Sequence, residues 1–308
     1  GEAVALEDRC AHRHVPLRLG RVVGDTAQCG YHGLCFDKEG RCVHVPGQDR
    51  IPAGATIRSF PVIERHALIW IWLGEAGRAD PALVPNCYWM DDPGWAVSKG
   101  YHHVAANYAL LNDNLLDLTH ESFVHIESIG NEAVANAPLS VELRDGAVHA
   151  SRMMLDCPPP PFYQTAAGFS GNIDRWHTTI YTPPGYCLIK NGAMPAGIGK
   201  DKARAQGLTR ERRVINLLTP ETERSTHYFW GIARSYDIDD EALTAHIGEA
   251  IVHTFNEDKV VLEAQQIAMD RHPNSLFPVA LRADGGAIHG RRLLEAALAA
   301  EQPKMAAE

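Results

Sequence analysis

The sequence contains 308 residues, of which 45% are hydrophobic, and its formal net charge is -9. Lys and Arg form no dense run, so the composition gives no support to binding of nucleic acid or of an anionic membrane surface. No apolar stretch approaches the ~20 residues of a membrane helix and the first residues lack a signal-peptide pattern, so we expect a cytoplasmic protein with small-molecule partners.

The first quarter of the chain alternates short apolar segments with turn signals. Residues 1–73 predict short strands separated by turns such as Val22-Val23-Gly24-Asp25, and they end in the apolar run 67–73. Residues 74–100 are dense in Gly, Pro, Asp and Asn and predict a connection between domains. Because the chain opens directly on a loop-like segment at Gly1, we expect that an N-terminal piece with supporting strands is missing.

The rest of the chain changes its pattern. Residues 106–125 are helical in character, and strands follow to about residue 235, with an interruption at Pro158–Pro161. A long helix is predicted over 240–270, beginning near Asp239-Asp240-Glu241. This order predicts an α+β domain in which helices pack against an antiparallel sheet.

These elements predict two domains, which suits the length of the chain. The first is a small all-β domain over residues 1–80. The second is the α+β domain over residues 81–308.

Two short segments pair one cysteine with one histidine: Cys10-Ala-His12 and Cys29-Gly-Tyr-His32. Four of the seven cysteines lie within residues 10–42, which suits metal binding in a reducing compartment better than a disulfide framework. In a Rieske 2Fe-2S cluster two Cys hold one iron and two His hold the other, so this set fits that demand. A structural zinc site with the same four ligands is the alternative.

The residues around these pairs carry a resemblance. The segments Cys10-Ala-His12-Arg13 and Cys29 to Gly33 resemble the Rieske domain of aromatic-ring oxygenases, which favours the cluster over zinc. Respiratory-chain Rieske proteins have an extra Cys in each loop for a bridging disulfide, and other residues stand there in this chain. His14 occupies a position where many oxygenases have Gly, and we expect its side chain to face solvent.

A second constellation runs from Asn114 to His125. Non-heme iron oxygenases bind iron on one face with two His and one carboxylate, and His120 and His125 could supply the histidines. Residues five apart lie ~140° round an ideal helix, so the helix should distort between them, by a π-type bulge for example. The alternative is that these histidines only cap or pack a helix.

The carboxylate must come from a distant segment. The segment around Phe255 to Gln266 resembles the part of Rieske oxygenases that donates it, which implies Asp258 as the third ligand. Glu257 and Glu263 are the competitors, since solvated carboxylates are common on surface helices.

The same resemblance implies a bridging role for Asp117. In this family the cluster of one subunit passes electrons to the iron of its neighbour through an Asp that contacts one His from each site. Here Asp117 would contact His120 and a neighbouring subunit's His32, and Asn114 is a further candidate at the iron site. Activity would then require a ring of subunits, most simply a homotrimer.

Similarity over most of the chain extends to segments 114–125, 218–222, 228–231 and 257–266, which look like vanillate O-demethylase oxygenase and its relatives, including dicamba monooxygenase. It implies an N-terminal all-β Rieske domain followed by a helix-grip (START-like) α+β catalytic domain. In that group a methoxy carbon of an aromatic acid is hydroxylated with O2, and the hemiacetal collapses to a phenol and formaldehyde. Electrons come from NADH through a flavin and ferredoxin-type reductase.

Substrate contacts are less defined by the sequence. Lys190, Asn191, His227 and Arg234 lie on strand-like segments that could face a pocket, and His227 is the candidate we retain. Three other functions stay open: ring hydroxylation or dihydroxylation of another aromatic substrate, a Rieske electron carrier, and a carrier of hydrophobic ligands.

Overall fold

The structure is a computed structural model that describes residues 1–272 and 279–301. The chain forms two compact units, Gly1–Asp91 and a second unit that begins at Asp92. The division falls inside the 74–100 segment. Within the described residues, no helix combines the length and apolar character needed to cross a membrane.

The first unit is built from short antiparallel strands. They are β1 (Ala5–Leu6), β2 (Arg21–Val23), β3 (Thr26–Gln28), β4 (Cys35–Phe36), β5 (Cys42–His44), β6 (Ser59–Phe60), β7 (Val62–Arg65) and β8 (Leu68–Ile71). Strands β2 to β5 form one sheet in chain order, while β1 pairs with β6 and β7 with β8. The β2–β3 turn places Gly24 at φ 57°, a backbone conformation that glycine adopts without strain. The unit is therefore all-β, as the sequence predicted.

The second unit contains a seven-stranded antiparallel sheet in the order β10-β11-β12-β13-β14-β15-β9. Its strands are β9 (Ala96–Val104), β10 (Ser140–Arg144), β11 (Ala147–Cys157), β12 (Ile173–Thr182), β13 (Tyr186–Pro195), β14 (Arg210–Thr222) and β15 (Ser225–Arg234). The long strands thus end close to residue 235, as predicted. Strand β9 was missed, because its first residues lie in a segment whose Gly and Pro content predicted a connection.

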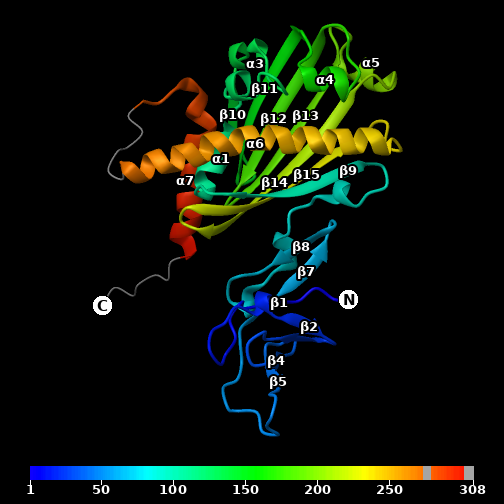
Figure 1. Cartoon of the computed structure of the whole chain (residues 1–308). Coiled ribbons are helices and arrows are strands. Elements are labelled where there is room, and N and C mark those ends of the chain that lie inside the picture. The colour runs from blue at the N-terminus through cyan, green and yellow to red at the C-terminus, as the bar shows by residue number, and fades with distance from the viewer. Residues whose placement is uncertain (273–278, 302–308) are drawn as a thin grey trace. The chain divides into compact units, whose positions relative to one another are not determined.

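Helices lie on this sheet. They are α1 (Tyr108–Leu116), α2 (Glu121–Val124), α3 (Glu132–Asn136), α4 (Pro161–Thr165), α5 (Lys200–Ala205), α6 (Glu241–Arg271) and α7 (Gly285–Glu301). Helix α6 runs across one face of the sheet (Figure 1). Its N-terminus is capped by Asp240, whose side chain accepts a 2.8 Å hydrogen bond from the Leu243 N–H. The α+β prediction is confirmed, including the long helix at 240–270.

The core of the second unit lies between α6 and the sheet. Along α6 the buried apolar side chains recur at Ile247, Ile251, Phe255 and Leu262, which is the spacing of one helix face. The Phe255 ring lies 5.8 Å from the Trp230 ring of β15. This packing fixes which face of α6 meets the sheet, and so decides which of its polar side chains are drawn inside.

Candidate functional site

The two Cys/His loops of the first unit have the same backbone hydrogen bonds. The Cys10 N–H donates to the Val15 carbonyl (2.9 Å), and the Cys29 N–H donates to the Leu34 carbonyl (2.8 Å). In each loop the residue four after the Cys closes the turn by donating to the Cys carbonyl, His14 in one and Gly33 in the other. Each loop therefore presents its Cys and its His from an equivalent turn.

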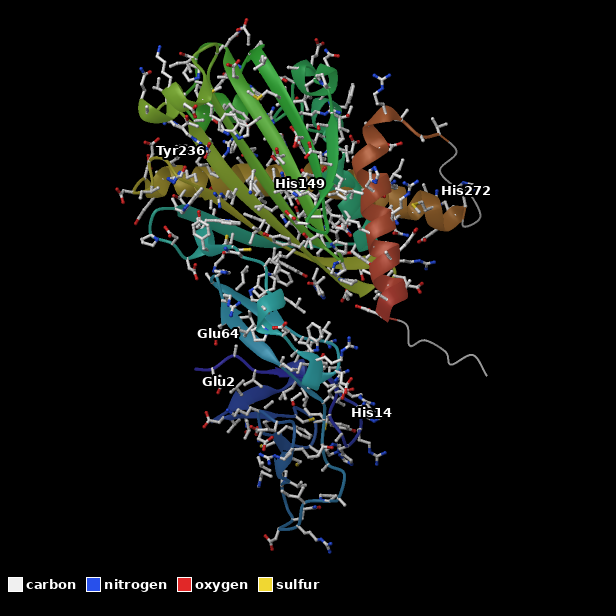
Figure 2. All side chains as sticks on the ribbon, turned by 180° about the vertical axis from the view of Figure 1, so that it is seen from behind. Glu2, His14, Glu64, His149, Tyr236 and His272 are labelled. Atoms are coloured by element: carbon white, nitrogen blue, oxygen red, sulfur yellow. The ribbon has the colours of Figure 1, made fainter. Side chains whose placement is uncertain are left out.

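His14 takes the conformation that Gly33 takes in the matching loop. Their φ values are 60° and 75°, so His14 occupies the left-handed region where a β-carbon is tolerated at some cost. The His14 side chain is exposed and lies on the surface of the first unit (Figure 2). The His residue thus fits the turn without displacing it, and its exposure agrees with the prediction.

The four side chains are arranged as two thiols and two imidazoles. Cys10 and Cys29 are buried, and burial together with the neighbouring Cys29 thiol raises the pKa of Cys10. His12 and His32 are exposed, with ring centroids 4.6 Å apart. The Cys10 and Cys29 thiols interact with each other, and the two imidazole rings lie side by side, so the loops present one pair of each ligand type. A Rieske cluster, in which two Cys hold one iron and two His the other, needs this pairing.

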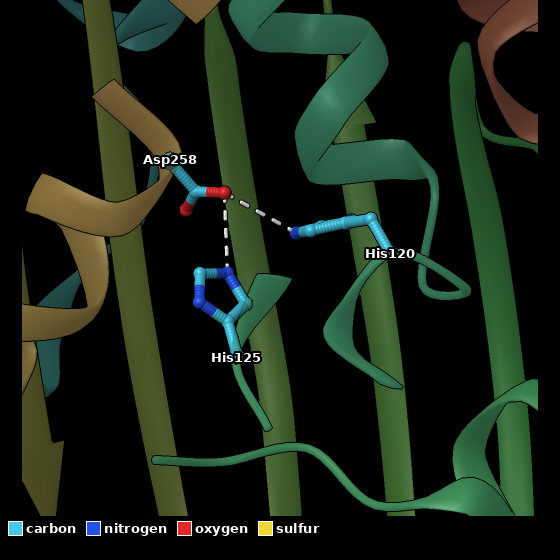
Figure 3. Close-up of side chains that lie close together, drawn as sticks. All are labelled: His120, His125 and Asp258. Atoms are coloured by element: carbon cyan, nitrogen blue, oxygen red, sulfur yellow. Dashed lines mark ion pairs between the residues drawn. The ribbon is translucent and has the colours of Figure 1, made fainter. Parts of the chain in front are cut away.

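In the second unit His120, His125 and Asp258 come together from two chain segments (Figure 3). His120 immediately precedes α2 and His125 immediately follows it, while Asp258 lies on the buried face of α6. One ligand atom from each of the three lies within 4.8 Å of the others. The carboxylate Oδ1 of Asp258 is 3.4 Å from His120 Nε2 and 3.1 Å from His125 Nε2.

The segment between these histidines lacks the predicted distortion, and the helix is interrupted before His120 instead. Helix α1 ends before Asp117, and α2 is a single short turn in which the His125 N–H donates to the Glu121 carbonyl. That is an ordinary α-helical bond, so the predicted π-type bulge is wrong. The chain then folds back on α2 at Gly130, where a β-carbon would lie 1.7 Å from the Glu121 carbonyl oxygen.

The electrostatics of the three residues favour a cation between them. Burial alone would lower the pKa of His120, but the Asp258 carboxylate outweighs burial and raises the pKa of His120 to about 9. Burial would raise the pKa of Asp258, but hydrogen bonds from the two imidazoles hold it well below its usual range. The attraction that favours a proton in this gap equally favours a divalent metal ion, which two His and one carboxylate could hold.

Each of the three side chains is oriented by a further contact. His120 Nδ1 contacts the Asp117 carbonyl oxygen, and His125 Nδ1 lies 2.8 Å from Glu257 Oε2. Asn114 donates a 2.9 Å hydrogen bond to Asp258 Oδ1. Such contacts fix the ring orientation and tautomer of a ligating His.

The competing carboxylates have other partners. Glu257 is turned to the outer nitrogen of His125, where it also accepts a hydrogen bond from Ser128 Oγ (3.0 Å). Glu263 accepts the Ala105 N–H (2.9 Å). Of these three carboxylates, only that of Asp258 contacts the Nε2 atoms of both His120 and His125.

Asp117 differs from the expectation in one respect. Its carboxylate Oδ1 accepts the Thr119 N–H (2.8 Å), and the contact with His120 is made by the Asp117 backbone carbonyl instead. Because α1 ends here, that carbonyl has no intrahelical partner and is available to the imidazole. The second carboxylate oxygen of Asp117 is not used in these contacts.

A cavity opens beside the three residues. Its walls are apolar along Leu118, Ile189, Val214, Ile232, Ile251 and Phe255. Polar groups also reach it, among them Asn191 of β13, Arg212 of β14 and the buried pair Glu121 and Arg175. Of these, the sequence had indicated only Asn191; charged residues inside long predicted strands were the signal that could have found Arg175 and Arg212.

The prediction for His227 is corrected by its surroundings. The neighbouring β15 residues Tyr228 and Trp230 pack on Phe255 of α6, so His227 points to the opposite face of the sheet. There it lies 2.8 Å from the Tyr101 hydroxyl, away from the cavity. Lys190 is likewise exposed.

Both units match known protein families. A model of the Vanillate O-demethylase oxygenase C-terminal domain matches residues 104–300, and a model of the Rieske [2Fe-2S] domain matches residues 1–61. The chain belongs to the Rieske non-heme iron oxygenases. Its cofactors are a Rieske 2Fe-2S cluster and a mononuclear iron, with O2 as co-substrate and NADH as the indirect electron source.

Individual relatives of this oxygenase component are similar over nearly its whole length. The vanillate O-demethylase oxygenase subunit of Pseudomonas sp. (strain ATCC 19151) is 41% identical, over 97% of this chain and 91% of that protein. The iron-sulfur subunit of the toluene-4-sulfonate monooxygenase system of Comamonas testosteroni is 40% identical, over 98% and 87%. The crystal structure of dicamba monooxygenase bound to 3,6 dichlorosalicylic acid superposes with a TM-score of 0.88 at 35% identity, over 96% and 87%. Relatives named as components of multicomponent systems imply that this oxygenase also works with a reductase.

Proposed function

We propose that this oxygenase component removes the methyl group of a methoxylated aromatic acid such as vanillate and releases formaldehyde. Similarity to vanillate and dicamba O-demethylases over nearly the whole chain supports the reaction. The observation that carries the proposal is the group of two His and one Asp beside a cavity with apolar walls. Electrons would arrive from a flavin and ferredoxin-type reductase.

The metal groups are assigned to specific residues. Cys10 and Cys29 would hold one iron of the cluster, and His12 and His32 the other. His120, His125 and Asp258 would hold the mononuclear iron, which supplies O2 activation when bound. The protein's own part is to orient the imidazoles through Asp117 and Glu257, and to exclude water with the apolar walls of the cavity.

The role of Glu257 can be measured separately. Glu257→Gln keeps an acceptor for His125 Nδ1 but removes the charge, so we expect mononuclear iron to bind about 10- to 100-fold more weakly while the cluster is unchanged. Iron retention would be measured in a chelator titration. The matched control is Glu263→Gln on the same helix, and equal iron retention in both variants would contradict an orienting role.

Substrate admission requires movement. The cavity volume is about 60 Å³, smaller than the ~150 Å³ engineered cavity that binds benzene. Side chains along the apolar wall must therefore shift before an aromatic ring can lie beside the three residues. We propose that the shape of this wall decides which ring substituents are accepted.

Assembly is part of the proposal. We propose a homotrimer in which Asp117 links His120 to a neighbouring subunit's His32. The exposed ring of His32 and the unused carboxylate oxygen of Asp117 support such a contact between subunits.

The second candidate is hydroxylation of another aromatic substrate. Similarity to the toluene-4-sulfonate monooxygenase subunit supports it, because the identity is nearly the same as that to vanillate O-demethylase. Both reactions would use the same metal groups, so only product analysis separates them. A Rieske electron carrier would not need the residues that gather around Asp258.

The test begins with metal content. Purified protein handled without air is expected to contain about three irons and two acid-labile sulfides per chain. With a reductase and NADH, methoxybenzoates should then yield equal amounts of phenol and formaldehyde. Zinc without sulfide would overturn the metal assignment, and ring hydroxylation without formaldehyde would favour the second candidate.

A further inference from the structure

A polar row crosses the sheet of the second unit. Strand register places five residues from β11 to β15 directly opposite one another: Arg152, His177, Asn191, Arg212 and Arg234. The next row on the same face is almost entirely apolar: Ala150, Thr179, Ile189, Val214 and Ile232. The row on the other side, Met154, Arg175, Ala193 and Arg210, carries two further arginines, so the apolar part of this face lies on one side of the polar row only.

Positive charge in this region exceeds its negative charge. Glu121 is the buried acid beside the row, and it already accepts from Arg175 Nη2 at 2.8 Å and faces His177 Nδ1 at 2.8 Å. Arg212 and Arg234 are each only 2% exposed. Across residues 1–272 and 279–301, neither of these two guanidinium groups forms an ion pair with a carboxylate.

Arg212 is the one of this pair that reaches the cavity beside His120, His125 and Asp258. Its Nε donates a weak 3.3 Å hydrogen bond to Asn191 Oδ1, and its Nη1 has no hydrogen-bond partner in the part of the chain that the structure describes. The guanidinium carbon lies over two rings, 4.5 Å from the centroid of Phe162 and 4.4 Å from that of Tyr163. The group is therefore fixed in place while part of its donor edge is unused.

A buried charge without a partner is unfavourable. Proteins retain such a charge where a bound ligand pairs with it. Arg234, directly across the strand pair, adds a second positive charge, although its Nη2 is occupied by the Asp240 carbonyl (2.7 Å) and Thr244 Oγ1 (3.0 Å). The planar donor edge of Arg suits a carboxylate or another oxyanion.

We infer that Arg212 binds the anionic substituent of the aromatic substrate, a carboxylate or a sulfonate, and so selects anionic over neutral rings. The inference rests on the proposed oxygenation of an aromatic acid and names the residue that recognises the acid. Asn191 positions the guanidinium, and the rings of Phe162 and Tyr163 pack against it. His120, His125 and Asp258 then face an aromatic ring that is anchored through its anionic group in the same cavity.

The test compares a charged ligand with a neutral ligand of the same shape. Reduced protein loaded with both metal groups is titrated without O2 with 4-methoxybenzoate and with 4-methoxybenzamide, and binding is followed by calorimetry. We expect the wild-type protein to prefer the benzoate by about 10-fold or more. Equal affinity for the two would overturn the inference without any variant.

Variants then assign the preference to one residue. Arg212→Met is expected to weaken the benzoate about 10- to 100-fold and to leave the affinity for the benzamide unchanged. Arg212→Lys, which keeps the charge but loses the planar donor edge, should fall between. Arg210→Met on the same strand is the control, since Arg210 donates to the Gly207 carbonyl and does not line this cavity.

Two results for the variants count against the inference. Arg212→Met could weaken both ligands by the same factor, which would show a packing role, or Arg210→Met could reproduce the benzoate-specific loss. Cluster absorption and iron content are recorded for each variant, so a misfolded protein is recognised, and the wild-type preference still decides the question. A methoxybenzenesulfonate is included, and loss of its affinity in Arg212→Met supports the inference whichever anion binds better.

The test of anion binding by Arg212 and the test of O-demethylation can fail independently. Binding that depends on Arg212, with no formaldehyde from any methoxybenzoate, would reject O-demethylation and keep the anion site. Formaldehyde release without a preference for the anion would do the reverse.

Discussion

Replacing His120 by Ala is expected to remove the mononuclear iron and to leave the visible absorption of the Rieske cluster in place. His125 and Asp258 would remain as two ligands, which is fewer than the three that hold iron in this class of site. Iron should fall from about three to about two per chain, and turnover should drop by more than the ~100-fold typical of losing only an orienting contact. Iron and sulfide analysis with a visible spectrum measures both.

The fold should tolerate this change. Without His120, the Asp258 carboxylate keeps its contacts with His125 (3.1 Å) and with the Asn114 side chain (2.9 Å), so no bare charge is left inside. Asp258→Asn should give the same loss of iron. His246→Ala is the matched control, since His246 is an exposed histidine of α6. Loss of the cluster spectrum in His120→Ala would contradict the division of ligands between the two metal groups.

Helical periodicity alone predicts one residue of this site, Asp258. The apolar face of α6 is marked by Ile251, Phe255 and Leu262, and Asp258 falls on that face, seven residues after Ile251. Glu263 does not fall on it. A single carboxylate on an apolar face is unusual, because burial penalises its charge unless a cation is near. The prediction of Asp258 could therefore have rested on the residues as well as on resemblance.

The side of the sheet on which a residue lies, and its neighbours on adjacent strands, could not be predicted from the sequence. In β15 the consecutive residues Tyr228, Phe229 and Trp230 are all aromatic, so the sequence gives no polarity contrast between the inner and the outer face of the strand. His227 was accordingly placed on the wrong side. The polar row containing Arg212 appears only once the register of five strands is known, since its members lie tens of residues apart.

The break between α1 and α2 was hidden for a different reason. The residues on both sides of Asp117 have good helical character, and the turn there is stabilised by local contacts such as the hydrogen bond from the Thr119 N–H to the Asp117 side chain. Such a turn competes with the helix by a small free energy. Because the apolar residues keep their helical spacing across Asp117, the sequence pattern predicts a continuous helix there.

Asp117→Asn is expected to keep both metal groups and to slow steady-state turnover by about 100-fold or more. The substitution is unusually specific in this structure. Asn retains a side-chain oxygen for the Thr119 N–H, and the contact with His120 comes from the backbone carbonyl of residue 117, which does not change. Only the negative charge and one acceptor oxygen are lost, and these are what the proposed link to a neighbouring subunit's His32 requires.

The measurement is single-turnover oxidation of the pre-reduced cluster in the presence of substrate and O2, alongside steady-state formaldehyde release. Asp113→Asn is the control, because Asp113 lies one turn earlier on α1 and pairs with Arg291 (2.6 Å). Slowing confined to Asp117→Asn, with unchanged iron and sulfide, would assign electron transfer to this carboxylate. Normal turnover in Asp117→Asn would remove it from the route, and equal slowing in both variants would instead indicate a general effect of negative charge on α1.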